Sequence, residues 1–261
     1  MSMRKPVGFL VASSVLFLLA CGGGEAPKTE TTTPAAPPAE AGAAPAAGAA
    51  TGTASIKGRI SFEGTAPAPE KVKVTADPKC AAMHPNGLEK SPIQVKDGGL
   101  ANVFIYVKSG ISGSYPAPTT AVTLDQTGCN YSPHIVALQA GQTLTIRNSD
   151  DTLHNIHPRP TVNTEFNIGQ PRKGMESSRS FEKPEVWITV GCDVHPWMRS
   201  YIAVVPHPFF AVSAEDGSFE IKGLPAGDYE IEAVHEKLDR QTQKITVKDG
   251  EAATLNLTFK G

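Results

Sequence analysis

The chain has 261 residues, with 24 lysines and arginines against 26 aspartates and glutamates, and a formal net charge of −2 at pH 7. A mildly acidic balance gives no electrostatic case for nucleic-acid binding. No constellation of general acid, general base or nucleophile stands out either, so we do not expect an enzyme.

The first residues have the pattern of a secretory signal. Arg4 and Lys5 precede an apolar run over residues 7–20, which is too short to cross a membrane. The run ends in Leu-Leu-Ala and is followed directly by Cys21. This ending resembles the lipobox of bacterial lipoproteins, in which the cysteine carries the lipid.

The lipobox resemblance implies where the protein resides. Residues 1–20 are expected to be a lipoprotein signal peptide, and Cys21 the lipidated mature N-terminus of a periplasmic, membrane-anchored protein. Gly22 after the cysteine favours the outer membrane of a Gram-negative cell. The alternative is an ordinary signal that is cleaved near Ala20 without addition of a lipid.

Residues 21–53 read as a linker. After the cysteine they are mostly Gly, Ala, Pro, Thr and Glu, with no aromatic or large aliphatic side chain. Such a composition cannot bury enough apolar surface to offset the entropy lost on ordering, so we expect a disordered tether. A flexible coil of this length spans roughly 30 Å, because its reach grows with the square root of residue number.

The remaining residues predict an all-β fold. Short alternating apolar runs recur between clusters of Gly, Pro, Asn and Asp, and no window shows a helical stripe, which is typical of sandwiches and barrels. The expected strands cover residues 56–62, 72–75, 101–107, 121–124, 135–138, 143–147, 186–190, 201–205, 218–221, 229–235, 243–247 and 253–259.

A hairpin and a tight turn mark the C-terminal part. From Asp216 to Tyr229 the sequence is Asp-Gly-x-Phe-x-Ile-x-x-Leu-Pro-x-Gly-x-Tyr. Asp-Gly suits a turn with positive φ, and Pro-x-Gly a second reversal. The run resembles the carboxypeptidase regulatory-like (transthyretin-like) β-sandwich domains, and the resemblance implies a second sandwich in this chain.

The family pattern begins with a strand like the one expected at residues 56–62, far from the hairpin in this sequence. We therefore expect residues 54–112 and 206–261 to form one discontinuous sandwich, with residues 113–205 inserted as a separate domain. The alternative is a sequential arrangement in which residues 54–112 belong to the middle domain.

The most specific chemical pattern lies in the middle of the chain. Cys192, His195 and Met198 are spaced three apart, so a short loop leaving a strand can direct all three at one centre. His154, which follows an alternating strand and a polar turn, is the best candidate for another ligand, with His157 as its competitor. One thiolate, two imidazoles and a weak thioether form the ligand set of blue-copper sites.

This pattern resembles the cupredoxins of the amicyanin and plastocyanin type. The shared elements are a His-Asn-Ile-His stretch after a strand ending in Asn, a Cys-x-x-His-Pro-x-Met-Arg loop, and a following valine-rich strand. The resemblance implies a Greek-key β-sandwich that holds one type 1 copper through His154, Cys192, His195 and Met198.

The same resemblance implies roles around the metal. The ring edge of His195 is expected to reach the surface as the electron port, with Pro196 and Trp197 as an apolar docking patch, although Trp197 can instead pack in the core. Asn155 is expected to hydrogen-bond to the ligand loop. Asp193 replaces an uncharged residue of the family, and its carboxylate should lower the reduction potential slightly.

Cysteine usage leaves one pair to explain. In an oxidising compartment, with Cys21 lipidated and Cys192 on the metal, Cys80 and Cys129 remain as one expected disulfide. The alternative is a second metal site, in which Cys80 acts with His84 and Cys129 with His134.

Three functions fit these observations. The first is an electron carrier that cycles between Cu(I) and Cu(II) and serves redox partners such as a cytochrome, a dehydrogenase or an oxidase. The second is a periplasmic copper buffer or chaperone without redox cycling. The third is a binding or adhesion module in which copper is incidental.

Overall fold

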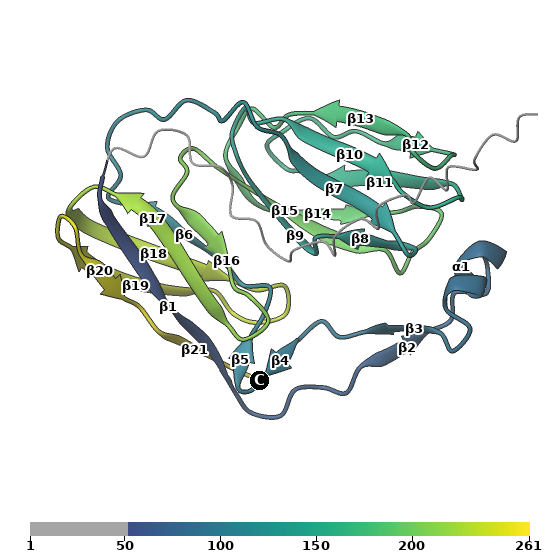
Figure 1. Cartoon of the computed structure of the whole chain (residues 1–261), viewed down its shortest axis with the longest axis horizontal. Helices are drawn as coiled ribbons and strands as arrows, with labels where there is room; N and C mark the ends of the chain where they lie inside the picture. The colour runs from purple at the N-terminus through teal and green to yellow at the C-terminus, as the bar shows by residue number, and fades with distance from the viewer. Residues whose placement is uncertain (1–51) are drawn as a thin grey trace, which may run out of the picture. The chain divides into compact units, whose positions relative to one another are not determined.

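The computed structural model describes residues 52–261, and Figure 1 shows the arrangement of their strands. The expected signal peptide, Cys21 and nearly all of the linker lie outside the described residues. The described part has strands β1 to β21 and one six-residue helix, α1, so the all-β expectation is confirmed. Within that part, no helix has the length and apolarity needed to cross a membrane.

The first β-sandwich combines strands from both ends of the described chain around one apolar core, which includes Ile56, Ile105 and Ile231. One sheet contains β1 (Ala54–Glu63), β4 (Val95–Lys96), β5 (Gly99–Leu100), β17 (Ser218–Leu224), β20 (Ala252–Thr254) and β21 (Leu257–Lys260). The other contains β6 (Phe104–Ser109), β16 (Phe210–Val212), β18 (Gly227–Val234) and β19 (Gln241–Val247).

The second β-sandwich is built from the middle of the chain around Leu124, Ile146, Ile188 and Ile202. One sheet has the order β13 (Glu176–Arg179), β10 (Leu144–Asn148), β7 (Val122–Thr127) and β8 (Asn130–Ser132). The other has the order β12 (Ile168–Gln170), β11 (His154–Arg159), β14 (Glu185–Gly191), β15 (Arg199–Val205) and β9 (Ile135–Gln139).

Strand β15 explains how the two sandwiches share apolar surface. Six of its seven residues are buried, so both of its faces are covered. One face enters the core of the second sandwich, while Tyr201, Ala203 and Val205 pack with Phe104 and Phe210 of the first. The strand is therefore apolar at successive positions because each of its two faces packs against a different sandwich core.

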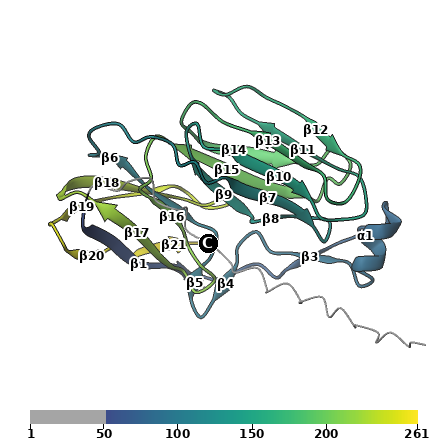
Figure 2. The ribbon, with the colours of Figure 1, turned by 45° about the horizontal axis from the view of Figure 1, so that its top comes forward.

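Residues 64–92, which we call the strap, leave the first sandwich after β1. The strap contains β2 (Glu70–Val72) and β3 (Leu88–Lys90), which pair only with each other, and α1 (Pro78–Met83) between them. Figures 1 and 2 show the strap in blue, apart from the strands of the first sandwich. The expected strand at residues 72–75 is wrong beyond Val72.

Helix α1 was not expected, because six residues are too few for a helical stripe. Its start is nevertheless encoded locally. Asp77 precedes the helix and accepts hydrogen bonds from the amides of Lys79 and Cys80, and Pro78 occupies the first turn, where its missing N–H costs nothing. The helix ends at Met83, where the His84 amide bonds back to the Cys80 carbonyl.

The loop after β11 is held by one carboxylate, which gives a pH-dependent prediction. Glu185 accepts hydrogen bonds from the amides of Thr161, Val162 and Asn163. Burial by itself raises the pKa of Glu185, but hydrogen bonds from the backbone and side chains of Thr161 and Asn163 lower it from 4.5 to about 2. Its stabilising contribution is therefore complete above pH 4.5 and is lost as pH falls towards 2.

We expect Glu185→Gln to lower the free energy of unfolding at pH 7 by about 1–2 kcal/mol, after allowing for partial solvent screening. The difference from the wild type should shrink below pH 4.5 and be mostly lost at pH 2, where about half of the wild-type carboxylate is protonated. Urea unfolding between pH 2 and 7 measures it, and a pH-independent difference would contradict this account.

Candidate metal centre

Three ligand-type side chains meet at one end of the second sandwich. His154 opens β11, Cys192 follows the last residue of β14, and His195 lies in the short loop that leads into β15. One side-chain atom from each lies within 4.8 Å of the other two. The three residues are 0%, 4% and 1% exposed, so they meet in a site closed to water.

The two imidazoles face each other through their Nδ1 atoms, which are 2.9 Å apart. Their Nε2 atoms point away, to Asp150 from His154 at 2.9 Å and to Asp77 from His195 at 3.2 Å. An ionised carboxylate only accepts hydrogen bonds, so each Nε2 donates and each neutral ring presents a lone pair at Nδ1. Two lone pairs at this separation repel each other unless a cation lies between them.

The pKa values of the two rings indicate that the pocket favours one positive charge and not two. Burial by itself lowers the pKa of His154, but hydrogen bonds to Asp150 and Cys192 outweigh it and raise the value to about 9. Burial keeps the pKa of His195 below its ordinary value despite the hydrogen bond to Asp77. The pocket therefore favours one cation, which can be a proton or a metal ion.

The surroundings of Cys192 lower the pKa of its thiol and so favour the thiolate. Its Sγ lies 3.7 Å from Nδ1 of His195 and 3.2 Å from Oδ1 of Asn155. Burial raises the pKa of a thiol, but the hydrogen bond with His154 and the backbone amides of Asn155 and His195 bring the pKa of Cys192 below its usual value. The thiolate is the form that binds metals, and a soft sulfur beside two imidazoles fits copper.

Met198, the remaining expected ligand, and His157, the competitor of His154, lie in different surroundings. Met198 is 1% exposed and belongs to the same apolar cluster as Cys192. His157 points elsewhere: its Nδ1 lies 3.0 Å from Asp193 and its Nε2 2.6 Å from Glu165. Of the two competing histidines, the fold brings His154 to the site.

Asn155 connects β11 to the ligand loop. Its Oδ1 accepts a hydrogen bond from the amide of Asp193 at 2.8 Å, and its Nδ2 donates to the carboxylate of that residue. Asp193 is also paired with His157 and with Arg159. These two partners offset its charge, which weakens the expected effect of Asp193 on the reduction potential.

The expected electron port is covered. The ring of His195 is 1% exposed, whereas the resemblance implied that its edge reaches the surface. Asp77 and the sulfur of Cys80, at 3.8 Å, lie against Nε2, and the Trp197 ring packs beside the imidazole at 4.9 Å between centroids. Pro196 is exposed and Trp197 is half-buried, with its indole N–H bonded to the Cys129 carbonyl.

Cys80 and Cys129 form a disulfide. The alternative second metal site is not assembled, because His84 bonds to the Gly128 carbonyl and His134 to Glu236. Two further clusters of ligand-type groups adjoin the imidazoles, but each depends on a sulfur of this disulfide. Those sulfurs are not thiolates while the bond exists.

Sequence reasoning missed both carboxylates that hold the imidazoles. Asp150 is four residues before His154, in the polar turn after β10, and its carboxylate also accepts the amides of Gly128 and Cys129. Asp77 is followed by a proline, and this pair is a readable helix-start signal. Nothing in the sequence, however, indicates that this helix lies against His195.

The chain is similar to several solved structures over part of its length. No family model matches the chain, and no curated protein does. Among solved structures, a copper(I) form of an amicyanin variant is 24% identical and covers 37% of this chain and 96% of its own, with a TM-score of 0.29. A purple cupredoxin from Nitrosopumilus maritimus is 22% identical and covers 31% of this chain and 97% of its own, with a TM-score of 0.28.

A copper-containing nitrite reductase from Thermus scotoductus is also similar, at 20% identity and a TM-score of 0.29. The match covers 37% of this chain and a quarter (25%) of the reductase. These structural neighbours are cupredoxins or contain copper, and the similarity covers a minor part of the present chain.

Proposed function

We propose that the chain is a blue-copper electron carrier whose ion is held by His154, Cys192, His195 and Met198. The observation that carries the proposal is geometric: the Nδ1 atoms of His154 and His195 face each other at 2.9 Å, and the Sγ of Cys192 lies 3.7 Å from Nδ1 of His195. Two imidazole nitrogens and a thiolate sulfur bind a soft metal cation well. A copper ion bound there would take up and release one electron by alternating between Cu(I) and Cu(II).

The protein's own contribution is to hold the donors still. His154 and Cys192 are attached to paired strands, β11 and β14, and Asn155 ties the first of these strands to the ligand loop. Each imidazole is oriented by a carboxylate on its Nε2 atom. A fixed ligand set needs little rearrangement when the charge of the ion changes, which suits rapid electron transfer.

We also propose where a redox partner docks. Leu153 and Val194, which are 42% and 45% exposed, each precede a candidate ligand, and Pro196 is exposed in the same loop. A small apolar patch of this kind suits a transient interface with another redox protein. In this proposal, lipidated Cys21 anchors the chain to a membrane that faces the periplasm. The redox partner is a cytochrome, a dehydrogenase or an oxidase.

Addition of Cu(II) to the purified chain tests this function. We expect one equivalent to bind and to produce the intense blue thiolate-to-copper charge-transfer band, which a reductant bleaches and an oxidant restores. A colourless Cu(II) complex would overturn the carrier function and favour a copper buffer. Absence of copper binding would overturn both and leave a binding module.

A further inference from the structure

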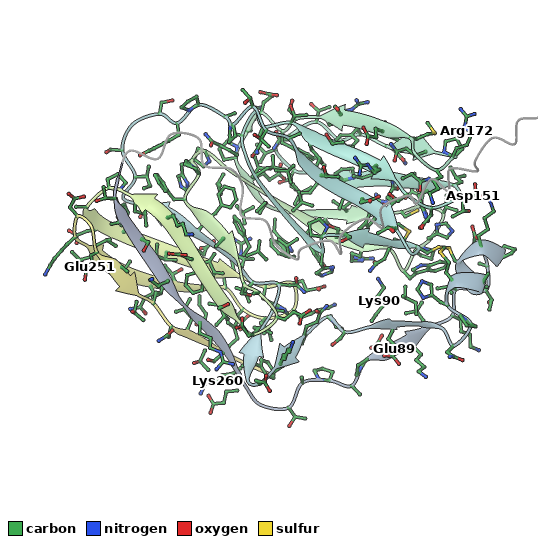
Figure 3. All side chains as sticks on the ribbon, viewed as in Figure 1. Glu89, Lys90, Asp151, Arg172, Glu251 and Lys260 are labelled. Carbon is green, nitrogen blue, oxygen red and sulfur yellow. A yellow bond between two sulfur atoms is a disulfide. The ribbon has the colours of Figure 1, made fainter. Side chains whose placement is uncertain are left out.

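The strap reaches the metal centre from outside the sandwich that holds the ligands. Its contacts meet two places on that sandwich, the turn after β10 and the β7–β8 hairpin. Lys79 forms an ion pair with Asp151 at 2.6 Å, Cys80 is bonded to Cys129, and Lys90 donates to Asn130. Figure 3 labels Asp151 at the loop end near α1, and Lys90 on the strap.

Asp77 is the strap residue whose carboxylate bonds to a candidate ligand, His195. One carboxylate oxygen, Oδ1, caps α1 by accepting the amides of Lys79 and Cys80. The other, Oδ2, accepts the Thr152 hydroxyl at 2.7 Å and Nε2 of His195 at 3.2 Å. The two oxygens therefore have separate tasks, one inside the strap and one at the metal centre.

The position of Asp77 is fixed by a covalent bond close to it. Cys80, three residues further on, is 0% exposed and joined to Cys129, which is also 0% exposed. The amide of Cys129 in turn bonds to Asp150, the carboxylate that holds His154. One disulfide thus connects the two carboxylates that orient the two imidazoles.

We infer that Asp77 is a positioning residue for His195, supplied by a strap that the Cys80–Cys129 disulfide locks over the metal centre. This inference rests on the proposed function. The locked strap shuts the Nε2 edge of His195 off from solvent and adds a negative charge behind that ligand. The metal's preference between its oxidation states then depends on a segment outside the metal-binding sandwich.

The direction of the effect follows from charge. A carboxylate that accepts the N–H of a ligand imidazole makes the ring a stronger donor. A stronger donor and an added negative charge both favour Cu(II) over Cu(I). Removing the Asp77 carboxylate should therefore weaken Cu(II) binding more than Cu(I) binding and raise the reduction potential.

Asp77→Asn and Asp77→Ser on the full chain test the inference, because asparagine and serine also cap helices well and leave α1 intact. We expect the ratio of the Cu(II) to the Cu(I) dissociation constant to rise at least tenfold, which corresponds to about 59 mV for a one-electron couple. Competition titrations and cyclic voltammetry measure it.

Asp151→Asn is the matched control. It removes a negative charge from the same junction, but Asp151 bonds to Lys79 of the strap and to neither imidazole. We expect this variant to change the ratio less than threefold. An Asp77→Asn shift no larger than the Asp151→Asn shift would overturn the inference.

Two measurements on the metal-free chain separate this inference from the proposed function. Long-range ¹H–¹⁵N NMR should show His195 as the Nε2–H tautomer in the wild type and a mixture in Asp77→Ser. Alkylation of Cys192, followed by peptide mass spectrometry, should be at least tenfold faster in Cys80→Ser/Cys129→Ser, whose strap is unlocked.

The outcomes are distinguishable. A wild-type chain without a blue band refutes the proposed function, while the NMR and alkylation results still test the strap. A blue wild type with an Nδ1–H tautomer at His195, or with equal alkylation rates in both chains, refutes the role of the strap alone.

Discussion

Replacing Cys192 by serine is expected to abolish the blue charge-transfer band completely. The band requires a thiolate, and a serine hydroxyl stays protonated and is a hard oxygen donor that suits copper poorly. The fold should survive, because the serine hydroxyl is nearly isosteric and can donate to Oδ1 of Asn155 as the thiol does. Absorption spectroscopy with one equivalent of Cu(II), together with circular dichroism, measures both expectations.

Two control variants make this result specific to the site. Val194 is 45% exposed in the same loop, so Val194→Ser should keep the band at full intensity. His157→Ala should also keep it, whereas His154→Ala should lose it, because only His154 meets Cys192 and His195. A band that survives in Cys192→Ser, or disappears in His157→Ala, would contradict the ligand set.

The second large effect concerns stability. Removing the disulfide as Cys80→Ala/Cys129→Ala is expected to lower the free energy of unfolding by about 4 kcal/mol if chain entropy dominates. The bond closes a loop with a sequence separation of 49 residues, and this loop includes strands from both sandwiches. Opening it frees a long segment in the unfolded chain, which gains the corresponding entropy.

Urea unfolding of the two chains under non-reducing conditions measures the loss. Cys21→Ser, which removes a cysteine outside the described residues, is the control and should leave the midpoint unchanged. Addition of a thiol reductant should shift the wild type towards the double variant and leave the double variant itself unaffected. Equal midpoints for wild type and double variant would contradict a stabilising role of the bond.

The three ligand-type side chains that meet in the structure, His154, Cys192 and His195, could be proposed from the sequence because their signals are local. Cys192 and His195 are three residues apart, directly after β14 and in the loop that follows, and this spacing predicts that they meet. His154 needed one more step, namely that a strand and a polar turn precede it. The all-β fold was equally readable, because alternation of apolar residues is a property of each strand by itself.

The surroundings of the ligands could not be predicted in this way. Asp77 lies 118 residues before His195, and nothing in its neighbourhood shows that the helix it caps is placed on a metal centre. The expected exposure of His195 failed for the same reason, since the resemblance covers the ligand sandwich and not the strap. The opposing charges around Asp193 likewise come from strand β11.

The sequence by itself determined the candidate donor atoms and the strands that carry them, because ligand chemistry and strand periodicity depend on neighbouring residues. Only the tertiary structure decided how those donors are covered and oriented. Burial of His195, the carboxylates on both imidazoles and the disulfide lock arise from contacts between distant segments. Such contacts depend on how the strap packs, and packing leaves no short-range pattern in the chain.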